Sequence, residues 1–145
     1  MQGFTAIDPS GTETYNPAGT AANHTESYMI RTRIIGTGSY LPELALSNRE
    51  VGTALGIEPE VVFRLTGIQE RRRAAPSQAT SDLAAEAGRQ ALEAAELPAS
   101  ELGAILLSTT SPDTAFPSTA CYVQRMLGCS TIPAFDVAAS CSGFL

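Results

Sequence analysis

Apolar blocks alternate with polar blocks along residues 30–145, and their lengths and periods predict strands and helices in turn. Residues 32–38 form a β-branched run that ends in glycines, which predicts a strand followed by a turn. A continuous apolar run at residues 103–109 predicts a second strand, and residues 133–137 predict a third. The run at 103–109 is apolar on both faces of a strand, which is typical of a parallel strand covered by helices on both sides.

Two short helices are predicted between the first strand and residue 70. Ser47 or Asn48 can cap the first helix, which is expected to end near Gly56. Pro59 suits the first position of the second helix, and Gly67 is expected to stop it.

The clearest helical pattern spans residues 82–97, with a cap at Thr80 or Ser81 and Pro98 after its end. Alanines dominate one face of this helix, which predicts close packing against a sheet. A last helix is expected from Pro117 to Gly128. The order of strands and helices predicts an α/β fold with right-handed crossovers.

Residues 1–29 lack this pattern. They are rich in Gly, Thr, Ala, Asn and Pro and contain the only histidine, His24. The segment is therefore predicted to be a disordered leader, with one folded unit at residues 30–145. A catalytic role for His24 is disfavoured because nothing is expected to order the chain around it.

Composition and charge narrow the functional classes. The net charge is −6 and all nine basic residues are arginines, which disfavours nucleic-acid binding. No apolar run is long enough to cross a membrane, and no signal-peptide pattern opens the chain. Three cysteines without metal-ligand spacing indicate a reducing, cytoplasmic setting and neither a metal site nor disulfides.

Two short motifs each have two interpretations. Gly36 and Gly38 invite a dinucleotide-binding reading, but Leu41 stands where the third glycine belongs. The run Glu70-Arg71-Arg72-Arg73 is interpreted mainly as a solvated loop with local ion pairs. Its alternative is a contact for an acidic carrier protein or a phosphate.

Cys141 is the candidate nucleophile. It follows the last predicted strand and is surrounded by small residues that permit a tight turn and a close approach of substrate. A helix beginning here would point its amides at the sulfur, favour the thiolate and stabilise an oxyanion. The competing interpretation is a buried structural cysteine, which is the reading preferred for Cys121 and Cys129.

Four blocks of residues resemble β-ketoacyl-acyl-carrier-protein synthase III, in family order and with family spacing. The blocks are residues 34–42, Thr66-Gly67-Ile68 with Glu70-Arg71, Thr109-Thr110-Ser111 with Ala115-Phe116-Pro117-Ser118, and residues 136–144. The resemblance covers residues 30–145 and implies the N-terminal half of a thiolase-like fold, whose full form is a five-layer homodimer.

The resemblance also implies a chemistry. Cys141 would take an acyl group from acyl-CoA and condense it, with loss of carbon dioxide, with malonyl on acyl carrier protein to start fatty-acid synthesis. It implies no cofactor beyond these substrates. Phe116 matches a phenylalanine that reaches across the dimer to the partner's acyl pocket, and Thr110 matches a position near that pocket.

The chain departs from the family in two respects. Val61 and Leu65 replace the tryptophan and arginine that hold the CoA nucleotide, and Arg64 lies one residue away. The family's catalytic histidine and asparagine, from the other half, match no residue here. The chain alone is therefore expected to be an inactive fragment. The alternatives are a polyketide-pathway synthase that uses a carrier-protein donor, and a non-catalytic module that binds a synthase or carrier protein.

Overall fold

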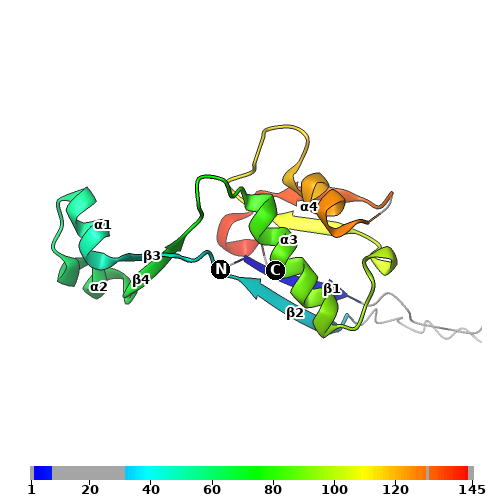
Figure 1. The fold of residues 1–145 in the computed structure, drawn as a ribbon, viewed down its shortest axis with the longest axis horizontal. Coiled ribbons are helices and arrows are strands. Elements are labelled where there is room, and N and C mark those ends of the chain that lie inside the picture. Colours follow the sequence, from blue (N-terminus) through cyan, green and yellow to red (C-terminus); the bar gives the residue numbers. More distant parts are fainter. Residues whose placement is uncertain (1, 8–31, 130, 144–145) are drawn as a thin grey trace, which may run out of the picture.

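Among the residues that the structure describes, the strands form three separate two-stranded sheets. The computed structural model describes residues 2–7, 32–129 and 131–143. In it, β1 (Gln2–Ile7) pairs antiparallel with β2 (Ile34–Tyr40), and β3 (Leu44–Ser47) pairs antiparallel with β4 (Glu70–Arg73). The third sheet joins β5 (Ile105–Ser108) and β6 (Ala134–Val137) in parallel (Figure 1).

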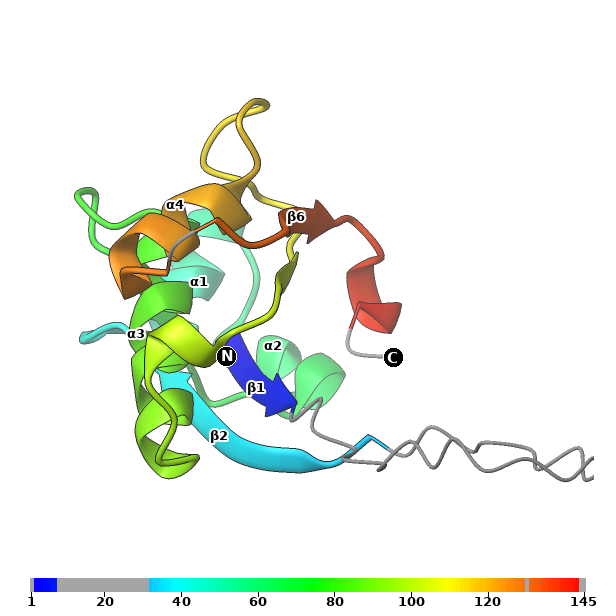
Figure 2. The same cartoon turned by 90° about the vertical axis from the view of Figure 1, so that its right-hand side faces the viewer.

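The core lies between the strands and two helices. Helix α4 (Thr119–Leu127) connects β5 to β6 and packs on both, and α3 (Thr80–Ala94) packs on β1, β2 and α4. Both helices cover the same side of the strands (Figure 2). The central cluster is buried and mixes small and branched residues: Ala84, Ala85, Ile105, Leu107, Ala120 and Val123. This is the helix-on-sheet arrangement that the α/β prediction required.

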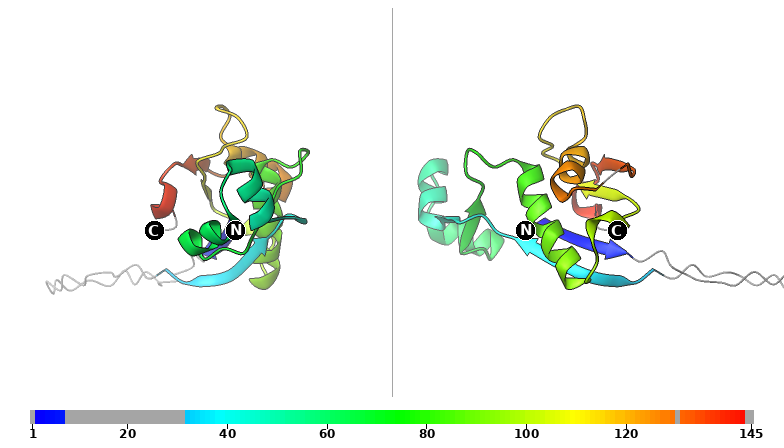
Figure 3. Two further views of the ribbon diagram at one scale, coloured as in Figure 1. Left: turned by 90° about the vertical axis from the view of Figure 1, so that its left-hand side faces the viewer. Right: turned by 45° about the vertical axis from the view of Figure 1, so that its right-hand side comes forward.

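A smaller unit projects from this core. It consists of β3, α1 (Asn48–Leu55), α2 (Pro59–Thr66) and β4, and it stands clear of the other elements (Figures 1 and 3). Asn48 ties its parts together, since its Nδ2 donates to the Ile68 carbonyl at 2.7 Å and its Oδ1 accepts from Arg71 at 2.8 Å.

Capping residues in the sequence correctly predicted both ends of α1 and α2 and the end of α4, whereas α4 begins at Thr119 and not at Pro117. Ser47 caps α1 with a reciprocal bond to Glu50, and Gly56 ends α1 in the left-handed conformation. Pro59 opens α2 and Gly67 ends it, again with a positive φ. Gly128 ends α4 in the same way.

Helix α3 differs from its prediction at both ends. It begins at Thr80, two residues early, because the Asp82 carboxylate accepts a bond from the Ala79 amide at 2.7 Å. It ends at Ala94 because Glu96 adopts a left-handed φ of 54° and the Leu97 amide bonds back to Leu92 at 3.0 Å. The chain therefore leaves the helix before Pro98 is reached.

Two predictions about strands were wrong, and a third is met only in part by the described residues. Gly36 and Gly38 do not end a strand, because β2 continues through them to Tyr40. Residues 70–73 are not a loop but strand β4, paired with β3. Strand β5 is covered on one side only among the described residues, since Leu106 is 61% exposed opposite the buried Ile105 and Leu107.

Strand β1 was not expected either. It falls within the segment predicted to be a disordered leader, yet residues 2–7 pair with β2 along their length. The prediction therefore does not hold for these six residues. Its remainder, including His24, lies outside the described residues.

Candidate active site

A cavity of about 400 Å³ lies at the carboxyl ends of β5 and β6. Its lining is Ser108, Thr109, Thr110, Ser111, Ser140 and Cys141. Because β5 and β6 are parallel, their carboxyl ends meet at one edge, and the Thr109 amide extends the ladder by donating to the Val137 carbonyl at 3.2 Å. This edge of a parallel sheet is where α/β folds bind their ligands.

Cys141 is an exposed free thiol in this cavity. It lies in the short 3₁₀ helix η2 (Ser140–Ser142), which follows β6 after two residues. Ser140 has a φ of 47°, a left-handed conformation that is uncommon outside glycine and turns the chain sharply before the thiol. The described residues end at Gly143, so the α-helix expected to begin at Cys141 stays a prediction, and with it the helix-dipole argument for the thiolate.

Gly143 lets the thiol-bearing turn lie directly against β5. A side chain at this position would overlap Ser108, and the turn closes with bonds from the Ser142 amide to Ala139 at 3.0 Å and from the Gly143 amide to Ser140 at 3.2 Å. The absence of a β-carbon at residue 143 therefore sets the closeness of Cys141 to the end of β5.

The structure brings two of the three predicted site residues together. Thr110 lines the same cavity as Cys141, in the loop that links β5 to α4. Phe116 belongs to the same loop but is 89% exposed and is absent from the cavity lining. This loop projects from the body of the molecule at the top of Figure 1.

Most of the cavity wall was missed from the sequence. Ser108, Ser111 and Ser140 supply hydroxyl groups beside the thiol, and none of them was singled out as a site residue. The pattern that could have found them is the run of four hydroxyl residues, 108–111, directly after an apolar strand. Such a run marks the end of the strand, where the chain turns into a polar loop.

The other two cysteines, Cys121 and Cys129, lie inside the fold and contact neighbouring elements. The Cys121 sulfur lies 3.3 Å from Ser118 Oγ and 3.8 Å from the Ala134 carbonyl oxygen, inside the β5–α4–β6 unit. Cys129 packs against the central cluster, and burial raises the pKa of its thiol. Both are half-buried, in agreement with the structural roles expected for them.

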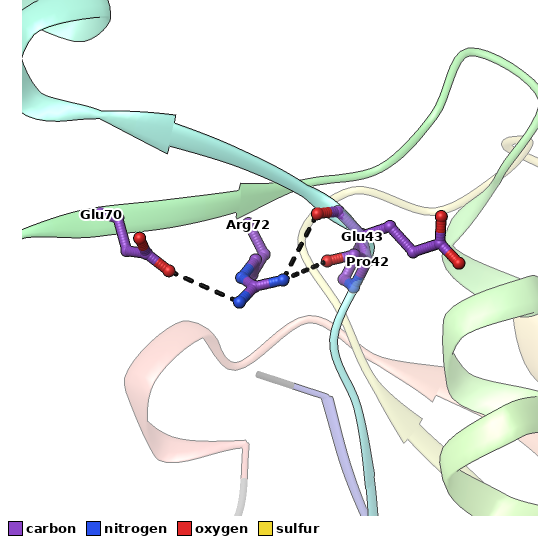
Figure 4. A network of polar contacts seen from close by, with 4 residues as sticks. All are labelled: Pro42, Glu43, Glu70 and Arg72. Atoms are coloured by element: carbon purple, nitrogen blue, oxygen red, sulfur yellow. Dashed lines mark hydrogen bonds and ion pairs between the residues drawn. The ribbon is translucent and has the colours of Figure 1, made fainter.

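Two of the three consecutive arginines are engaged within the chain. Arg72 reaches Glu70 at 3.4 Å and donates to the carbonyls of Pro42 and Glu43 at 3.3 Å each (Figure 4). Arg71 bonds to Asn48. These contacts fit the local ion pairing that was expected, although the segment is a strand.

The two glycines of β2 serve packing. A β-carbon at Gly36 would collide with the Ala91 carbonyl of α3, and one at Gly38 with the Ala87 carbonyl. The pair therefore lets α3 approach β2 closely, and its place inside a strand is not that of a phosphate-binding turn. The described part of the chain also holds no cluster of His, Cys, Asp and Glu suited to a metal ion.

The described residues hold no histidine or free asparagine that could assist Cys141. No histidine occurs in them, and their one asparagine, Asn48, is engaged with Ile68 and Arg71. Val61 and Leu65 both lie on α2, where Leu65 is 75% exposed.

Relatives of the chain are numerous among known proteins, although no family model matches it. It is 52% identical over 114 residues to the acetoacetyl CoA synthase NphT7 of Streptomyces sp. (strain CL190), covering 79% of this chain and 35% of that protein. It is 50% identical over 117 residues to the β-ketoacyl-[acyl-carrier-protein] synthase III of Laribacter hongkongensis, covering 81% and 37%. The chain is a homologue of β-ketoacyl-[acyl-carrier-protein] synthase III. It spans about a third of the length of the synthases that it matches.

Solved synthase III structures share its fold. The enzyme from Aquifex aeolicus VF5 superposes with a TM-score of 0.72 at 42% identity, over 76% of this chain and 35% of the enzyme. The priming β-ketosynthase of the R1128 polyketide pathway superposes with a TM-score of 0.69 at 31% identity, over 72% and 31%. The predicted fold, part of a thiolase-like α/β fold, is confirmed.

The helices were compared with the length and hydropathy of a membrane span. Within residues 2–7, 32–129 and 131–143, none combines the length and the hydropathy that a membrane span requires.

Proposed function

We propose that Cys141 is the acyl-accepting nucleophile of a synthase III-type condensing enzyme. The observation that carries the proposal is its exposed thiol in a hydroxyl-lined cavity at the carboxyl ends of β5 and β6. The chain also aligns with synthases III at about half identity over about 80% of its length.

The proposed transfer is a thioester exchange. The Cys141 thiolate attacks the carbonyl carbon of an acyl thioester, a new carbon–sulfur bond forms, and the donor's carbon–sulfur bond breaks. The donor leaves as a thiolate and takes up the proton that Cys141 lost. Hydroxyl groups of Thr110 and Ser111, in the cavity wall, are available to the carbonyl oxygen as it gains charge.

Condensation with a malonyl thioester is proposed for the whole enzyme, with fatty-acid initiation as its role. That step needs groups to stabilise the enolate left by decarboxylation. The described residues offer neither a histidine nor an uncommitted asparagine for it. We therefore propose that the 145-residue chain alone accepts acyl groups but does not condense them.

The proposed partners follow from the same role. They are an acyl-CoA or acyl carrier protein, and a second copy of the enzyme that Phe116 would contact. The projecting Phe116, at 89% exposure, supports such a contact. We propose a cytoplasmic setting and no cofactor beyond the substrates.

A polyketide-pathway synthase is the second candidate. Val61 and Leu65 replace the residues expected to hold a CoA nucleotide, which favours a carrier-protein donor. The likeness to the R1128 priming β-ketosynthase points in the same direction.

The test is intact-mass spectrometry of the purified chain after incubation with acetyl-CoA or with acetyl carrier protein. One acetyl group should appear on the native chain and on Cys121→Ala but not on Cys141→Ala. Acetylation of Cys141→Ala to the native extent would overturn the proposal. The ratio of the two donor rates separates the fatty-acid role from the polyketide role. Sustained ketoacyl formation with malonyl carrier protein would refute inactivity in condensation.

A non-catalytic binding module remains the alternative from another class. A pull-down with a full-length synthase and with acyl carrier protein tests it, with Phe116→Ala as the matched variant. Binding without any acyl transfer to Cys141 would favour the module.

A further inference from the structure

The loop between β5 and α4 is fastened at one acidic residue, Asp113. Its Oδ1 accepts a hydrogen bond from the Ser81 amide, in the first turn of α3, at 3.0 Å. Its own backbone amide donates to Thr119 Oγ1, at the start of α4, at 2.9 Å. Thr119 and Ser81 are both buried, so Asp113 joins the beginnings of two helices inside the protein.

This fastening divides the loop into a held part and a projecting part. Before Asp113, the Ser111 carbonyl accepts a bond from Thr80 Oγ1 at 2.7 Å, and the Ser111 amide donates to Thr109 Oγ1 at 3.1 Å. After Asp113 the chain runs out to the exposed Phe116. The held part contains Thr110 and Ser111, which form one wall of the Cys141 cavity.

We propose that Asp113 is a positioning residue for acyl transfer to Cys141. It touches neither the thiol cavity nor the proposed substrate, and it acts by holding the Thr110–Ser111 wall in register with the sulfur. A thioester carbonyl must lie within a narrow range of distance and angle of the attacking sulfur, so a loose wall costs rate. The claim that Asp113 aids acyl transfer rests on the proposed function. The claim that Asp113 holds the Thr110–Ser111 wall does not.

Asp82 provides a matched control on the same helix. Its carboxylate accepts the Ala79 amide at 2.7 Å, so it also caps the beginning of α3. No hydrogen bond joins Asp82 to the loop among the described residues. Asp82→Ala and Asp113→Ala should therefore weaken α3 similarly, whereas only Asp113→Ala also loosens the wall, by removing the bond from the Ser81 amide.

The experiment measures two rates at Cys141 in the full chain, with melting curves to confirm folding. One is acyl transfer from the donor that the native chain accepts. The other is modification by N-ethylmaleimide, which needs only access to the sulfur. Asp113→Ala should slow acyl transfer about ten-fold, because a small misplacement of the reacting groups is costly. It should speed maleimide modification about three-fold, because a released wall opens more often.

Two further variants sharpen the result. Asp113→Asn keeps an acceptor oxygen in the same place and should restore acyl transfer to about half the native rate or more. Thr80→Val removes only the bond to the Ser111 carbonyl, so it should shift both rates in the same directions by smaller factors. If Asp113→Ala does not fold, Thr80→Val still tests whether loosening the wall changes the two rates.

Each outcome decides the matter. If the acyl-transfer and maleimide rates change equally in Asp82→Ala and Asp113→Ala, Asp113 acts only as a helix cap and the proposal is overturned. Unchanged rates in Asp113→Ala would overturn it as well. If the native chain takes no acyl group while the maleimide pattern holds, the wall assignment stands and the acyl-transfer function fails.

Discussion

The carboxylate of Asp136 accepts the backbone amide of Thr119 at 2.7 Å, with its other oxygen 2.8 Å from the amide of Ala120. Asp136 lies on β6 and Thr119 opens α4, so the strand caps the helix that precedes it in the chain. Both amide-bearing residues are fully buried and have no access to water. The strand that leads to Cys141 and the helix that follows the cavity loop are thereby locked together.

Removing this cap should cost stability. Asp136→Ala leaves two buried amides without acceptors, and we expect the free energy of unfolding to fall by about 2 kcal/mol. Asp136→Asn keeps one acceptor oxygen and should lose about half as much. Urea unfolding followed by circular dichroism measures both, and equal stability of Asp136→Ala and the native chain would contradict the assignment.

The distance along the chain explains which caps could be predicted. Ser47, Gly56 and Gly67 act on helices that begin or end beside them, so a local pattern reveals them. Asp136 and Asp113 act on helices 17 and 32 residues away, and nothing in the local sequence marks those bonds.

The close contact between β2 and α3 gives a second prediction. A β-carbon on Gly38 would collide with the backbone of Ala87 and Ala91, which cannot yield as a side-chain tip can. Gly38→Ala should therefore lower the free energy of unfolding by about 1 to 3 kcal/mol.

Gly103 is the matched control for this substitution. Nothing lies within 4 Å of its β-carbon position, so Gly103→Ala should change stability by less than about 0.5 kcal/mol. Similar losses in the two variants, measured by urea unfolding, would show that contact with α3 is not the cause.

The thiols should differ in reactivity. Burial raises the pKa of Cys129, so a smaller fraction of it is thiolate at pH 8 than in an ordinary cysteine. Cys141 is exposed, and we expect iodoacetamide to modify it about ten-fold faster than Cys129. Peptide mass spectrometry at timed intervals measures both rates. The modification rate of Cys129 should keep rising with pH beyond the pH at which the rate of an ordinary free cysteine becomes constant. If the Cys129 rate becomes constant at the same pH as that of a free cysteine, the prediction is refuted.

The candidate site was only partly visible in the sequence. Cys141 stood out because it follows a predicted strand among small residues and because its block resembles synthase III, which outweighed the structural interpretation. The hydroxyl wall did not, because Ser108 and Ser140 are 32 residues apart and meet only when β5 and β6 pair in parallel. Around Cys141 the described chain shows the 3₁₀ turn η2, and the helix expected to begin there stays a prediction.

Glu50 gives the last prediction, a pH dependence within α1. Its Oε2 accepts bonds from Ser47 Oγ and from the Ser47 amide, at 2.7 Å each. Both bonds favour the carboxylate, the hydroxyl bond most, and they hold the pKa of Glu50 below the ordinary value of a glutamate. Because the pKa is lowered in the folded state, the stabilisation is present at neutral pH and is lost as pH falls through the folded pKa.

The Ser47 amide resonance, followed by NMR through an acid titration, reports this pKa. Its midpoint should lie below that of an ordinary glutamate, and Ser47→Ala should move the midpoint back toward the ordinary value. The return should be incomplete, because the backbone bond survives the substitution. Glu50→Gln should abolish the titration altogether. A native midpoint at or above the ordinary value would mean that the reciprocal cap does not form in solution.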